Sequence, residues 1–437
     1  MGLSTAVGIA TKLREHRFQA WLVGGCVRDL ALGREPKDYD IATDARPDRL
    51  LELFPKAQFV GAQFGVVLVE GVEVATFRSD HAYQDGRHPS EVTFEADPKQ
   101  DVLRRDFTIN ALLLDPLAMS SPVVDYVGGQ EDLRNHIIRA IGDPEQRFQE
   151  DHLRMLRAVR FAARFGFEIE PATMAAIQKL HQQILRVSPE RIRDELVRIL
   201  TEGAARRGFE LLDETGLLGD VLPEVAAMKG VQQPPQFHPE GDVWTHTLIM
   251  LEGLKSPEPE LALGVLLHDV GKPGTFRVAD RIRFDGHVEL GERMARDILS
   301  RLRFSNAEIE QVVALVANHM RFKHVHEMRE STLKRMLRLN RFDEHLELHR
   351  LDCESSHGNL ENYELAKSRF EQSPPEELRP PRLLTGDDLI AAGYRPGPDF
   401  ARMLEAVEDA QLEGRIQSKE EALELARSTM GPANRVP

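Results

Sequence analysis

Two aspartates separated by one residue are the first groups in this 437-residue sequence whose types and spacing could do chemistry. Asp38 and Asp40 flank Tyr39 and lead into an apolar segment. Residues i and i+2 of a strand point to the same face, so a strand here would project both carboxylates together. Like charges repel, and the usual reason for such a pair is a hard divalent cation such as Mg²⁺, which takes oxygen ligands.

A glycine pair and an arginine stand just upstream of these aspartates. Gly24 and Gly25 follow the apolar run 21–23, and they let backbone N–H groups approach an anion closely. Arg28 adds a forked cation that suits phosphate. With the aspartates, they predict a metal–triphosphate site. The chemistry expected there is two-metal phosphoryl transfer, in which the metals lower the pKa of an attacking hydroxyl and neutralise the leaving pyrophosphate.

Two further segments could complete a nucleotide site. Residues 104–110 read R-R-D-F-T-I-N. They could simply begin a solvated strand, but near a triphosphate Arg105 can bind phosphate and Asp106 can accept from a ribose hydroxyl. In segment 150–161 an acid and three arginines recur every third residue, which is the spacing of a helical stripe: Asp151, Arg154, Arg157 and Arg160.

This stripe has two interpretations. One is a salt-bridged surface helix, the common fate of such a pattern. The other is that an aspartate and an arginine present acceptors and donors to the edge of a base. A helix of this kind could select a nucleotide without a template.

A last group of residues follows the H…HD…D pattern of HD phosphohydrolases, with extra histidines. An adjacent His and Asp at one helix end can both reach a metal. HD domains hydrolyse phosphomonoesters or phosphodiesters; alternatively, the fold serves here only as a scaffold facing RNA. The candidate metal ligands are His246, His268, Asp269, His287, His319 and Asp352.

Strand and helix signals alternate at the start of the chain and become helical later. Helices are expected over 1–20 and 47–54, and helical periodicity dominates from about residue 130. The first part is therefore an α/β domain with a mixed sheet. Its candidate strands are 21–23, 38–42, 57–60, 65–69, 72–77, 91–94, 111–115 and 123–125.

Length and composition limit the class of protein. A chain of 437 residues with 41% hydrophobic and 29% charged residues should be globular and hold several domains. No apolar run approaches the length of a membrane span, and the N-terminus has no signal-peptide pattern. Cys26 and Cys353 lie far apart, which argues against a disulfide framework and favours the cytoplasm.

Charge is unevenly distributed along the chain. The net charge is −15, yet residues 134–207 hold 14 Lys/Arg against 10 Asp/Glu, a local net charge of +4. This basic stretch follows the carboxylate domain, where a polyanion would need it. A Pro- and Glu-rich stretch at 373–381 is typical of a linker before an acidic helical tail.

Five ordered motifs resemble those of class II tRNA nucleotidyltransferases and bacterial poly(A) polymerases. The resemblance is tight over about the first 220 residues and looser beyond. The motifs are G-G-C-V-R-D with D-Y-D, R-R-D-F-T-I-N-A-L, D-Y-V-G-G-Q-E-D-L from Asp125, E-D-H-L-R-M-L-R-A-V-R-F and S-P-E-R-I-R-D-E-L from Ser188.

The resemblance implies an α+β fold with a polymerase-β-like head and an all-α remainder. The implied domains are a head at 1–133, a neck at 134–207, a body containing the HD domain at 208–370 and a tail at 371–437. The implied activity is template-independent addition of C and A to a tRNA 3′ end from CTP and ATP. It also implies Mg²⁺ in the head and Ni²⁺, Mn²⁺ or Mg²⁺ in the HD domain.

Residue roles follow from the same resemblance. Asp38 and Asp40 bind metal, and Asp151 with Arg154 reads the base, supported by Arg157 and Arg160. The head–neck hinge is 125–133. The remaining implied nucleotide contacts, mainly to triphosphate and ribose, are Gly24, Gly25, Arg28, Arg105, Asp106 and Asn110.

Other members of this group of enzymes remain alternatives. Poly(A) polymerases typically carry a basic C-terminal extension, whereas residues 371–437 hold 8 basic and 13 acidic residues. CC-adding enzymes are expected to have a shortened loop between the first two motifs, and 78–89 looks full length. Full CCA addition and addition of the terminal A alone both stay open. A phosphohydrolase with a degenerate head is the third alternative, against which the intact D-Y-D and R-R-D argue.

Overall fold

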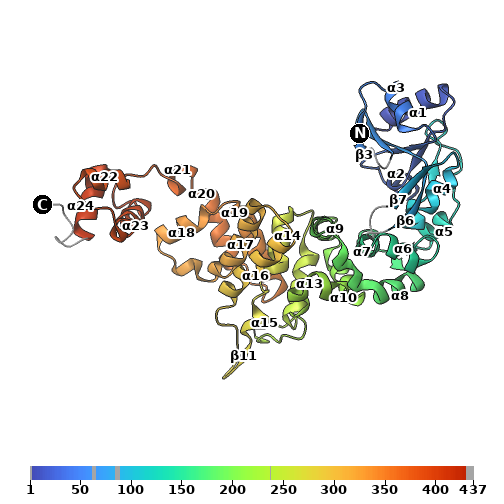
Figure 1. The fold of residues 1–437 in the computed structure, drawn as a ribbon. Coiled ribbons are helices and arrows are strands. Elements are labelled where there is room, and N and C mark those ends of the chain that lie inside the picture. The colour runs from blue at the N-terminus through green and yellow to red at the C-terminus, as the bar shows by residue number, and fades with distance from the viewer. Residues whose placement is uncertain (1, 62–64, 84–88, 237, 430–437) are drawn as a thin grey trace. The chain divides into compact units, whose positions relative to one another are not determined.

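A computed structural model describes residues 2–61, 65–83, 89–236 and 238–429 (Figure 1). The chain divides into two compact units. The first comprises Met1–Ala227, Leu254–Pro259 and Ile298–Phe304, and the second comprises Met228–Gly253, Glu260–Asp297 and Ser305–Pro437. The finer division into head, neck, body and tail stays a prediction. None of the described helices is long and apolar enough to cross a membrane.

A six-stranded mixed sheet forms the head and confirms the expected fold class. Its order is β3-β4-β5-β2-β1-β8, with β2 parallel to β5 and the other neighbours antiparallel. The strands are β1 (Trp21–Val23), β2 (Asp40–Thr43), β3 (Gln58–Gly61), β4 (Val66–Val69), β5 (Val72–Thr76) and β8 (Leu113–Leu114). The head helices are α1 (Leu3–Glu15), α2 (Gly25–Ala31), α3 (Pro47–Leu53), α4 (Pro98–Leu103), η2 (Thr108–Asn110) and α5 (Gly129–Arg134).

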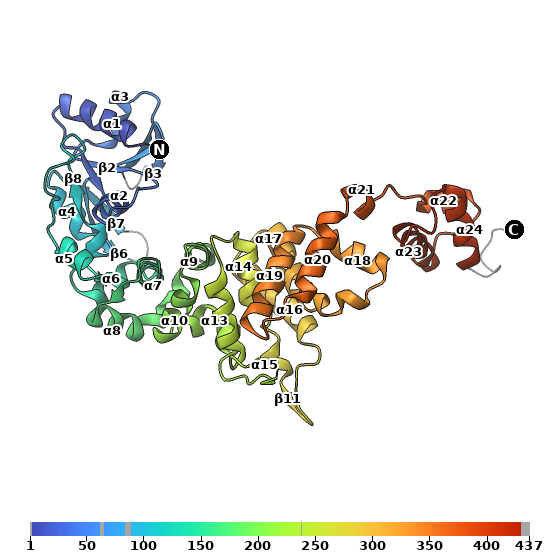
Figure 2. The ribbon, with the colours of Figure 1, turned by 180° about the vertical axis from the view of Figure 1, so that it is seen from behind.

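Alternating side chains anchor this sheet. Val72 and Val74 of β5 are buried while Glu73 between them is exposed, as expected for a strand with one face on the core. On the buried side, Phe77 packs in a cluster with Val23 and Leu113. The views from front and back both place α1 beside α3 (Figures 1 and 2). The sheet thereby fixes the ends of β1 and β2, where the predicted site lies.

Several predicted elements have different limits in the structure. The first helix ends at Glu15, and β2 begins at Asp40, so Asp38 precedes the strand instead of lying on it. The strand expected at 123–125 is only an isolated bridge between Val124 and Leu113. The expected loop at 78–89 contains β6 (Arg78–Tyr83), which pairs with β7 (Pro89–Phe94). Residues 84–88 of that loop lie outside the described residues.

The rest of the first unit is mainly helical. Amphipathic α7 buries Met155, Val159 and Phe161 in contact with α9 and α10. Helices are expected throughout from about residue 130, but this region also contains two short parallel strands, β9 (Ile137–Ile138) and β10 (Glu168–Ile169). The helices are α6 (Pro144–Glu150), α7 (Leu153–Phe165), α8 (Pro171–Leu180), η3 (His181–Arg186), α9 (Pro189–Thr201), α10 (Ala205–Glu214), α11 (Leu217–Val221) and α12 (Pro223–Ala226).

In its described residues, 228–236 and 238–429 apart from the segments assigned to the first unit, the second unit is helical with one small hairpin. The hairpin consists of β11 (Arg277–Val278) and β12 (Ile282–Arg283). The helices are α13 (Val243–Gly253), α14 (Pro259–Leu267), α15 (Lys272–Thr275), α16 (His287–Arg301), α17 (Asn306–Asn318), η4 (His319–Glu327), α18 (Glu330–Leu337), α19 (Phe342–Ser355), α20 (Glu361–Gln372), α21 (Pro375–Leu378), α22 (Gly386–Ala391), α23 (Pro398–Leu412) and α24 (Lys419–Thr429).

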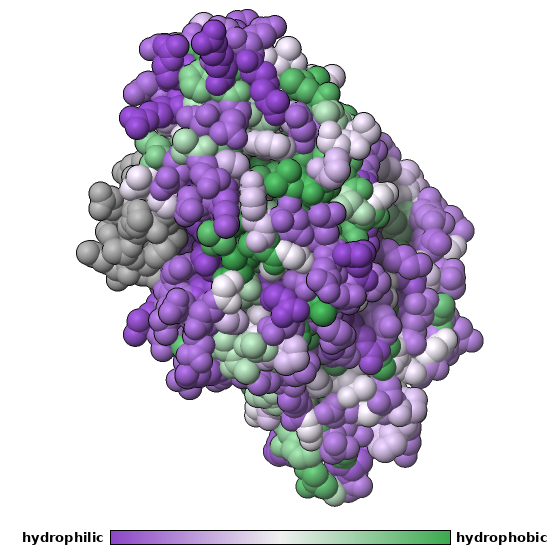
Figure 3. Space-filling view, turned by 90° about the vertical axis from the view of Figure 1, so that its right-hand side faces the viewer, coloured by the Kyte–Doolittle hydropathy of each residue, from purple (hydrophilic) through white to green (hydrophobic). Residues whose placement is uncertain are grey.

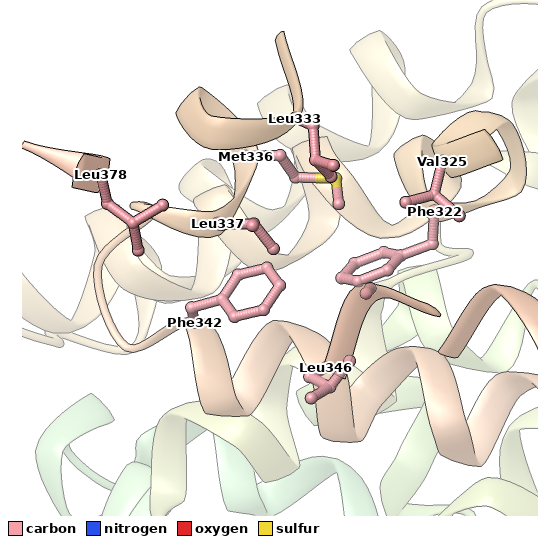
Figure 4. Close-up of a cluster of buried hydrophobic side chains, with 9 residues drawn as sticks. Phe322, Val325, Leu333, Met336, Leu337, Phe342, Leu346 and Leu378 are labelled. Carbon is pink, nitrogen blue, oxygen red and sulfur yellow. The ribbon is translucent and has the colours of Figure 1, made fainter. Parts of the chain in front are cut away.

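A buried cluster in this unit includes one residue of the predicted linker. Figure 4 shows Phe322, Phe342 and Leu346 facing one another, with Leu378 at the edge of the group. Leu378 belongs to α21, within the stretch 373–381 that the sequence predicted to be a linker, and it is only 6% exposed. Burial of one leucine contributes roughly 2 kcal/mol, so the stretch is anchored at this residue, while its other residues are exposed or half-exposed.

Candidate functional site

Three carboxylates gather at the start of β2. Asp40 is the first residue of β2, and Asp38 lies two residues before it with Tyr39 buried between them. The parallel register Ile41↔Val74 places Glu73 of β5 beside Asp40. Burial raises the pKa of Asp40 to about 6, helped by the charges of Glu73 and Asp38 and opposed by Arg105. A bound cation would relieve this repulsion, so the donor set fits a divalent metal.

Glycines at the end of β1 leave room for guanidinium groups. Gly24 has φ +72°, and a Cβ there would lie 3.1 Å from Nη1 of Arg105. A Cβ on Gly25 would lie 3.4 Å from Nη2 of Arg28. The positive φ and the tighter contact favour glycine at position 24, whereas the contact at position 25 is an ordinary one. Both arginines lie beside the turn that leads into α2.

Arg28 is more enclosed than the sequence suggested. It is 4% exposed and donates to Asp29 through Nε (2.9 Å) and Nη2 (2.7 Å), and to Oδ1 of Asn110 through Nη1 (2.6 Å). Its guanidinium also lies 4.6 Å from the ring centroid of Phe165. Its phosphate contact remains a prediction; in the structure it links α2 to Asn110.

Asp106 connects the head to α7. Its Oδ1 accepts from the backbone N–H of Phe107 (2.8 Å) and from Nδ2 of Asn110 (3.1 Å), while its Oδ2 accepts from Nε (2.9 Å) and Nη2 (2.6 Å) of Arg157. Burial alone would raise the pKa of Asp106, but Arg157 outweighs it and lowers the pKa to about 2. Arg105 beside it donates to Asp101 (3.0 Å). These four donors fill the carboxylate, so a ribose hydroxyl would have to displace one of them.

Asp151 does not lie on the predicted helix. It has an extended backbone between α6 and α7, while Arg154, Arg157 and Arg160 lie on α7. Its Oδ1 accepts from the N–H of Leu153 (3.1 Å), the first residue of α7, a local contact that competes with continuation of the helix. Asp151 and Arg154 remain close in sequence but are held by different partners.

Arg160 has a structural environment. It is 4% exposed, its Nε donates to Glu195 (2.6 Å), its Nη1 lies 3.5 Å from Glu202, and its guanidinium stacks on Phe161 at 4.2 Å. This buried ion pair joins α7 to α9. The supporting role in base reading that the resemblance implied for Arg160 stays a prediction.

Arg160→Ala is expected to lower the free energy of unfolding of the first unit by about 3 kcal/mol, because it leaves the buried Glu195 without its main partner. Urea denaturation measures this. Arg206→Ala is the matched control, since its ion pair with Glu210 is half-exposed and such surface pairs contribute about 0.5 kcal/mol or less. Equal losses in the two variants would contradict a structural role for the Arg160–Glu195 pair.

The six histidine and aspartate candidates of the second unit form one cluster. Four of them begin or directly follow a helix, and the other two lie on α13 and in the last turn of α19. Two groups of three offer ligand atoms within 4.8 Å of one another: His246, His268 and Asp352, and Asp269, His287 and His319. Asp269 lies near both groups, with Oδ2 3.1 Å from Nε2 of His268 and Oδ1 3.7 Å from Nε2 of His319.

The histidines of this cluster are fixed in one orientation. Nδ1 of His268, His287 and His319 lies 2.7 to 2.8 Å from the carbonyl oxygen three residues earlier. Such a contact makes Nδ1 the donor and leaves the lone pair on Nε2. Burial lowers the pKa of His319 to about 4, so that imidazole is neutral at pH 7. A neutral imidazole aimed at a carboxylate is a metal-ligand arrangement. His246 differs, because burial alone would lower its pKa but the carboxylates of Asp352 and Glu240 outweigh that burial and raise the pKa to about 9.

Polar atoms at the centre of the cluster lack hydrogen-bond partners. Each is buried, and none of them hydrogen-bonds to any of the described residues, although ion-pair distances of 3.1 to 3.8 Å separate several of them. Buried polar atoms are rarely left this way without a ligand. The atoms are Nε2 of His246, His268, His287 and His319, and Oδ1 of Asp269.

Some residues of both sites did not stand out in the sequence. Glu73 is an isolated acid in an apolar strand, and its place beside Asp40 depends on strand order. Arg191 and Glu195 occur in the fifth motif, but their partners lie 40 and 35 residues earlier. Oε1 of Glu240 lies 2.7 Å from Nδ1 of His246. Because Glu240 precedes His246 by only six residues, the sequence could have indicated this contact.

Three family models match the chain. Residues 20–139 match the poly A polymerase head domain, and residues 166–229 match the "Probable RNA and SrmB- binding site of polymerase A". Residues 286–426 match tRNA nucleotidyltransferase domain 2. These ranges cover the head, much of the helical remainder of the first unit, and most of the second unit.

Curated relatives and a solved structure agree with these matches. A crystal structure of the Bacillus stearothermophilus CCA-adding enzyme in complex with CTP superposes with a TM-score of 0.74 at 27% identity, covering 98% of this chain and 97% of that one. The Lactobacillus helveticus CCA-adding enzyme is 42% identical over 266 residues, which span 59% of this chain and 65% of that enzyme. The Bacillus pumilus CCA-adding enzyme is 31% identical over 96% of this chain and 95% of its own length. This chain belongs to the family of CCA-adding enzymes.

Proposed function

We propose that this protein adds C and A to the 3′ end of tRNA, using CTP and ATP and releasing pyrophosphate. The observation that supports this most is that side-chain hydrogen bonds connect the head to helix α7 within the first unit. The Asp38–Asp40 pair in the head has the chemistry for phosphoryl transfer, and Asp106 joins the head through Arg157 to the helix that carries Arg154. The relatives named CCA-adding enzymes favour CCA addition over poly(A) synthesis.

Each group of side chains has a separate task in this reaction. Asp38 and Asp40, with Glu73 beside them, would hold the divalent metal that the family uses, which we take to be Mg²⁺. Bound there, the metal neutralises phosphate charge and makes the 3′-hydroxyl a better nucleophile. The turn at Gly24 and Gly25, with Arg28, Arg105 and Asn110 around it, would receive the triphosphate and ribose.

Base selection follows from hydrogen-bond chemistry. Cytosine and adenine both carry an exocyclic amino group, while uracil and guanine carry a carbonyl oxygen at that position. A carboxylate such as Asp151 accepts from the amino group and repels the carbonyl. Arg154 can donate to the neighbouring ring nitrogen. One pair of side chains would therefore accept C and A and reject U and G.

Product sequencing tests the proposal. The protein is incubated with tRNA ending at the discriminator base, with tRNA-C and with tRNA-CC, and with each nucleotide alone and mixed. We expect C, C and A to be added in order and extension to stop after A. No extension of any acceptor would contradict the proposal. Extension of tRNA-CC alone would indicate an A-adding enzyme, and long A tails on unrelated RNA would indicate a poly(A) polymerase.

We also propose that the histidine–aspartate cluster binds a divalent metal and hydrolyses phosphoesters. The unpartnered Nε2 atoms and Asp269 Oδ1 support a metal there, and imidazole with carboxylate suits Ni²⁺ or Mn²⁺ as well as Mg²⁺. Lys272 contacts Asp269 at 2.6 Å and Oε1 of Gln233 at 2.7 Å, which keeps a cation beside the ligands. A phosphate group of the substrate would meet this positive edge.

Action in the cytoplasm is part of the proposal. Cys26 and Cys353 are both buried and free, as is usual where thiols stay reduced. The surface seen in Figure 3 is mainly hydrophilic, with hydrophobic side chains in small groups, and tRNA is the partner that the family relationship supports.

A further inference from the structure

Asp151 is held by a residue from another helix. Nη1 and Nη2 of Arg191 on α9 donate to Oδ1 (3.2 Å) and Oδ2 (2.7 Å) of Asp151. The side chains of Arg191 and Asp151 are only 23% and 18% exposed. A forked contact of this kind fixes the plane of a carboxylate as well as its position.

Arg154 is held by different groups. Its Nη1 donates to the carbonyl of Arg147 (3.0 Å) and to Oε2 of Glu150 (2.6 Å). Its Nη2 donates to the carbonyl of Arg104 in the head (3.1 Å). The two side chains that would read the base therefore have separate supports: α9 holds Asp151, while α6 and the head hold Arg154.

The remaining hydrogen-bonding capacity of both groups fits this task. Asp151 accepts from Arg191 twice and from the N–H of Leu153, so about one of its four lone-pair sites is left. Arg154 has five N–H donors and uses three of them. One acceptor beside two donors matches the amino edge of cytosine or adenine.

We propose that Arg191 is a specificity-determining positioning residue, which aims the last free lone pair of Asp151 at the exocyclic amino group of the incoming nucleotide. This inference rests on the proposed nucleotidyltransferase function. Without Arg191, the carboxylate can rotate, and another donor, such as water, can bridge it to the carbonyl of uracil. Selectivity then falls more than the overall rate does.

The test compares CTP with UTP on tRNA ending at the discriminator base, using the full chain. In Arg191→Gln, the ratio of kcat/KM for CTP to that for UTP should fall about tenfold or more, as expected when a charge-assisted contact is lost. Arg191→Lys keeps the charge with a single donor centre and should restore part of the ratio. In an Asp151→Ala background, Arg191→Gln should change the ratio less than about twofold, because Arg191 acts only through Asp151.

Controls separate this role from a structural one. Arg206→Gln removes a surface arginine of the same unit and should leave the ratio unchanged. Equal losses with CTP and UTP in Arg191→Gln, with the ratio intact, would overturn the proposal and make Arg191 a purely structural residue. If Arg191→Gln fails to fold, Arg191→Lys replaces it in the test. A lower ratio of kcat/KM for CTP to that for UTP would then support the proposal, and an unchanged ratio would overturn it. Failure of the wild-type protein to use CTP would instead contradict the proposed function itself.

Discussion

Asp40→Asn is expected to reduce nucleotide addition by about a thousandfold or more, equivalent to roughly 4 kcal/mol of lost transition-state stabilisation. Asp40 stands at the first position of β2, between Asp38 and Glu73, and repulsion among these carboxylates is part of what keeps its pKa raised. An amide has the same shape but no charge, so the site loses attraction for a divalent metal. Single-turnover extension of tRNA by CTP measures the effect.

The fold should tolerate this change. Replacing Asp40 relieves repulsion in the metal-free protein, so the free energy of unfolding should stay the same or rise slightly. Asp48→Asn, at an exposed aspartate in the first turn of α3, is the matched control and should retain activity within about twofold. Extension by Asp40→Asn at a rate near that of wild type would show that the metal site lies elsewhere.

Asp269→Asn is expected to remove the metal from the histidine–aspartate cluster while leaving nucleotide addition unchanged within about twofold. Asp269 approaches His268 through Oδ2 and His319 through Oδ1, so both groups of ligands lose a negative charge. Metal analysis of the purified full-length protein should show at least about one bound equivalent in wild type and less than about a tenth of that in the variant. Hydrolysis of p-nitrophenyl phosphate and of a bis(p-nitrophenyl) ester should be lost with it.

A matched histidine variant completes this experiment. His324→Gln changes an exposed histidine of η4, the same element that begins with His319, and should keep both metal and hydrolysis. Unchanged metal content in Asp269→Asn would refute the assignment of the ligands. A third outcome is that wild type binds the metal and Asp269→Asn loses it, but wild type hydrolyses neither ester. The cluster would then be a structural scaffold. Nucleotide addition is measured on the same samples, because it shows that the first unit is still folded and active in each variant.

Helical and strand periodicity predicted most of the elements correctly. The alternating valines of β5 and the amphipathic pattern of α7 indicate their burial directly, because each side chain's environment follows from its position in a regular repeat. The limits were less accurate. The first helix ends through local hydrogen bonds of His16 and Arg17 to the carbonyls of Leu13 and Arg14. The start of β2 depends on its pairing with β1, and β6 pairs with β7; spacing alone reveals neither pairing.

The linker prediction did not foresee one anchored residue, for a related reason. The stretch 373–381 has the composition of a free connector, yet Leu378 within it is buried against Phe342 and its neighbours. Composition describes the average solvation of a segment. Whether one leucine finds an apolar surface is decided by helices elsewhere in the chain.

The sequence by itself determined the chemistry available to this protein. It supplied the two aspartates, the glycine turn, the acid–arginine series and the six histidine and aspartate candidates for metal binding, because residue types and short spacings fix which groups can bind metal, phosphate or a base. Tertiary structure decided how those groups are paired. Only the packing of β2 on β5 places Glu73 beside Asp40, only α7 brings Arg157 to Asp106, and only α9 brings Arg191 to Asp151. Electrostatic pairing depends on distance in space, and residues forty or fifty positions apart come within reach only when the chain has folded.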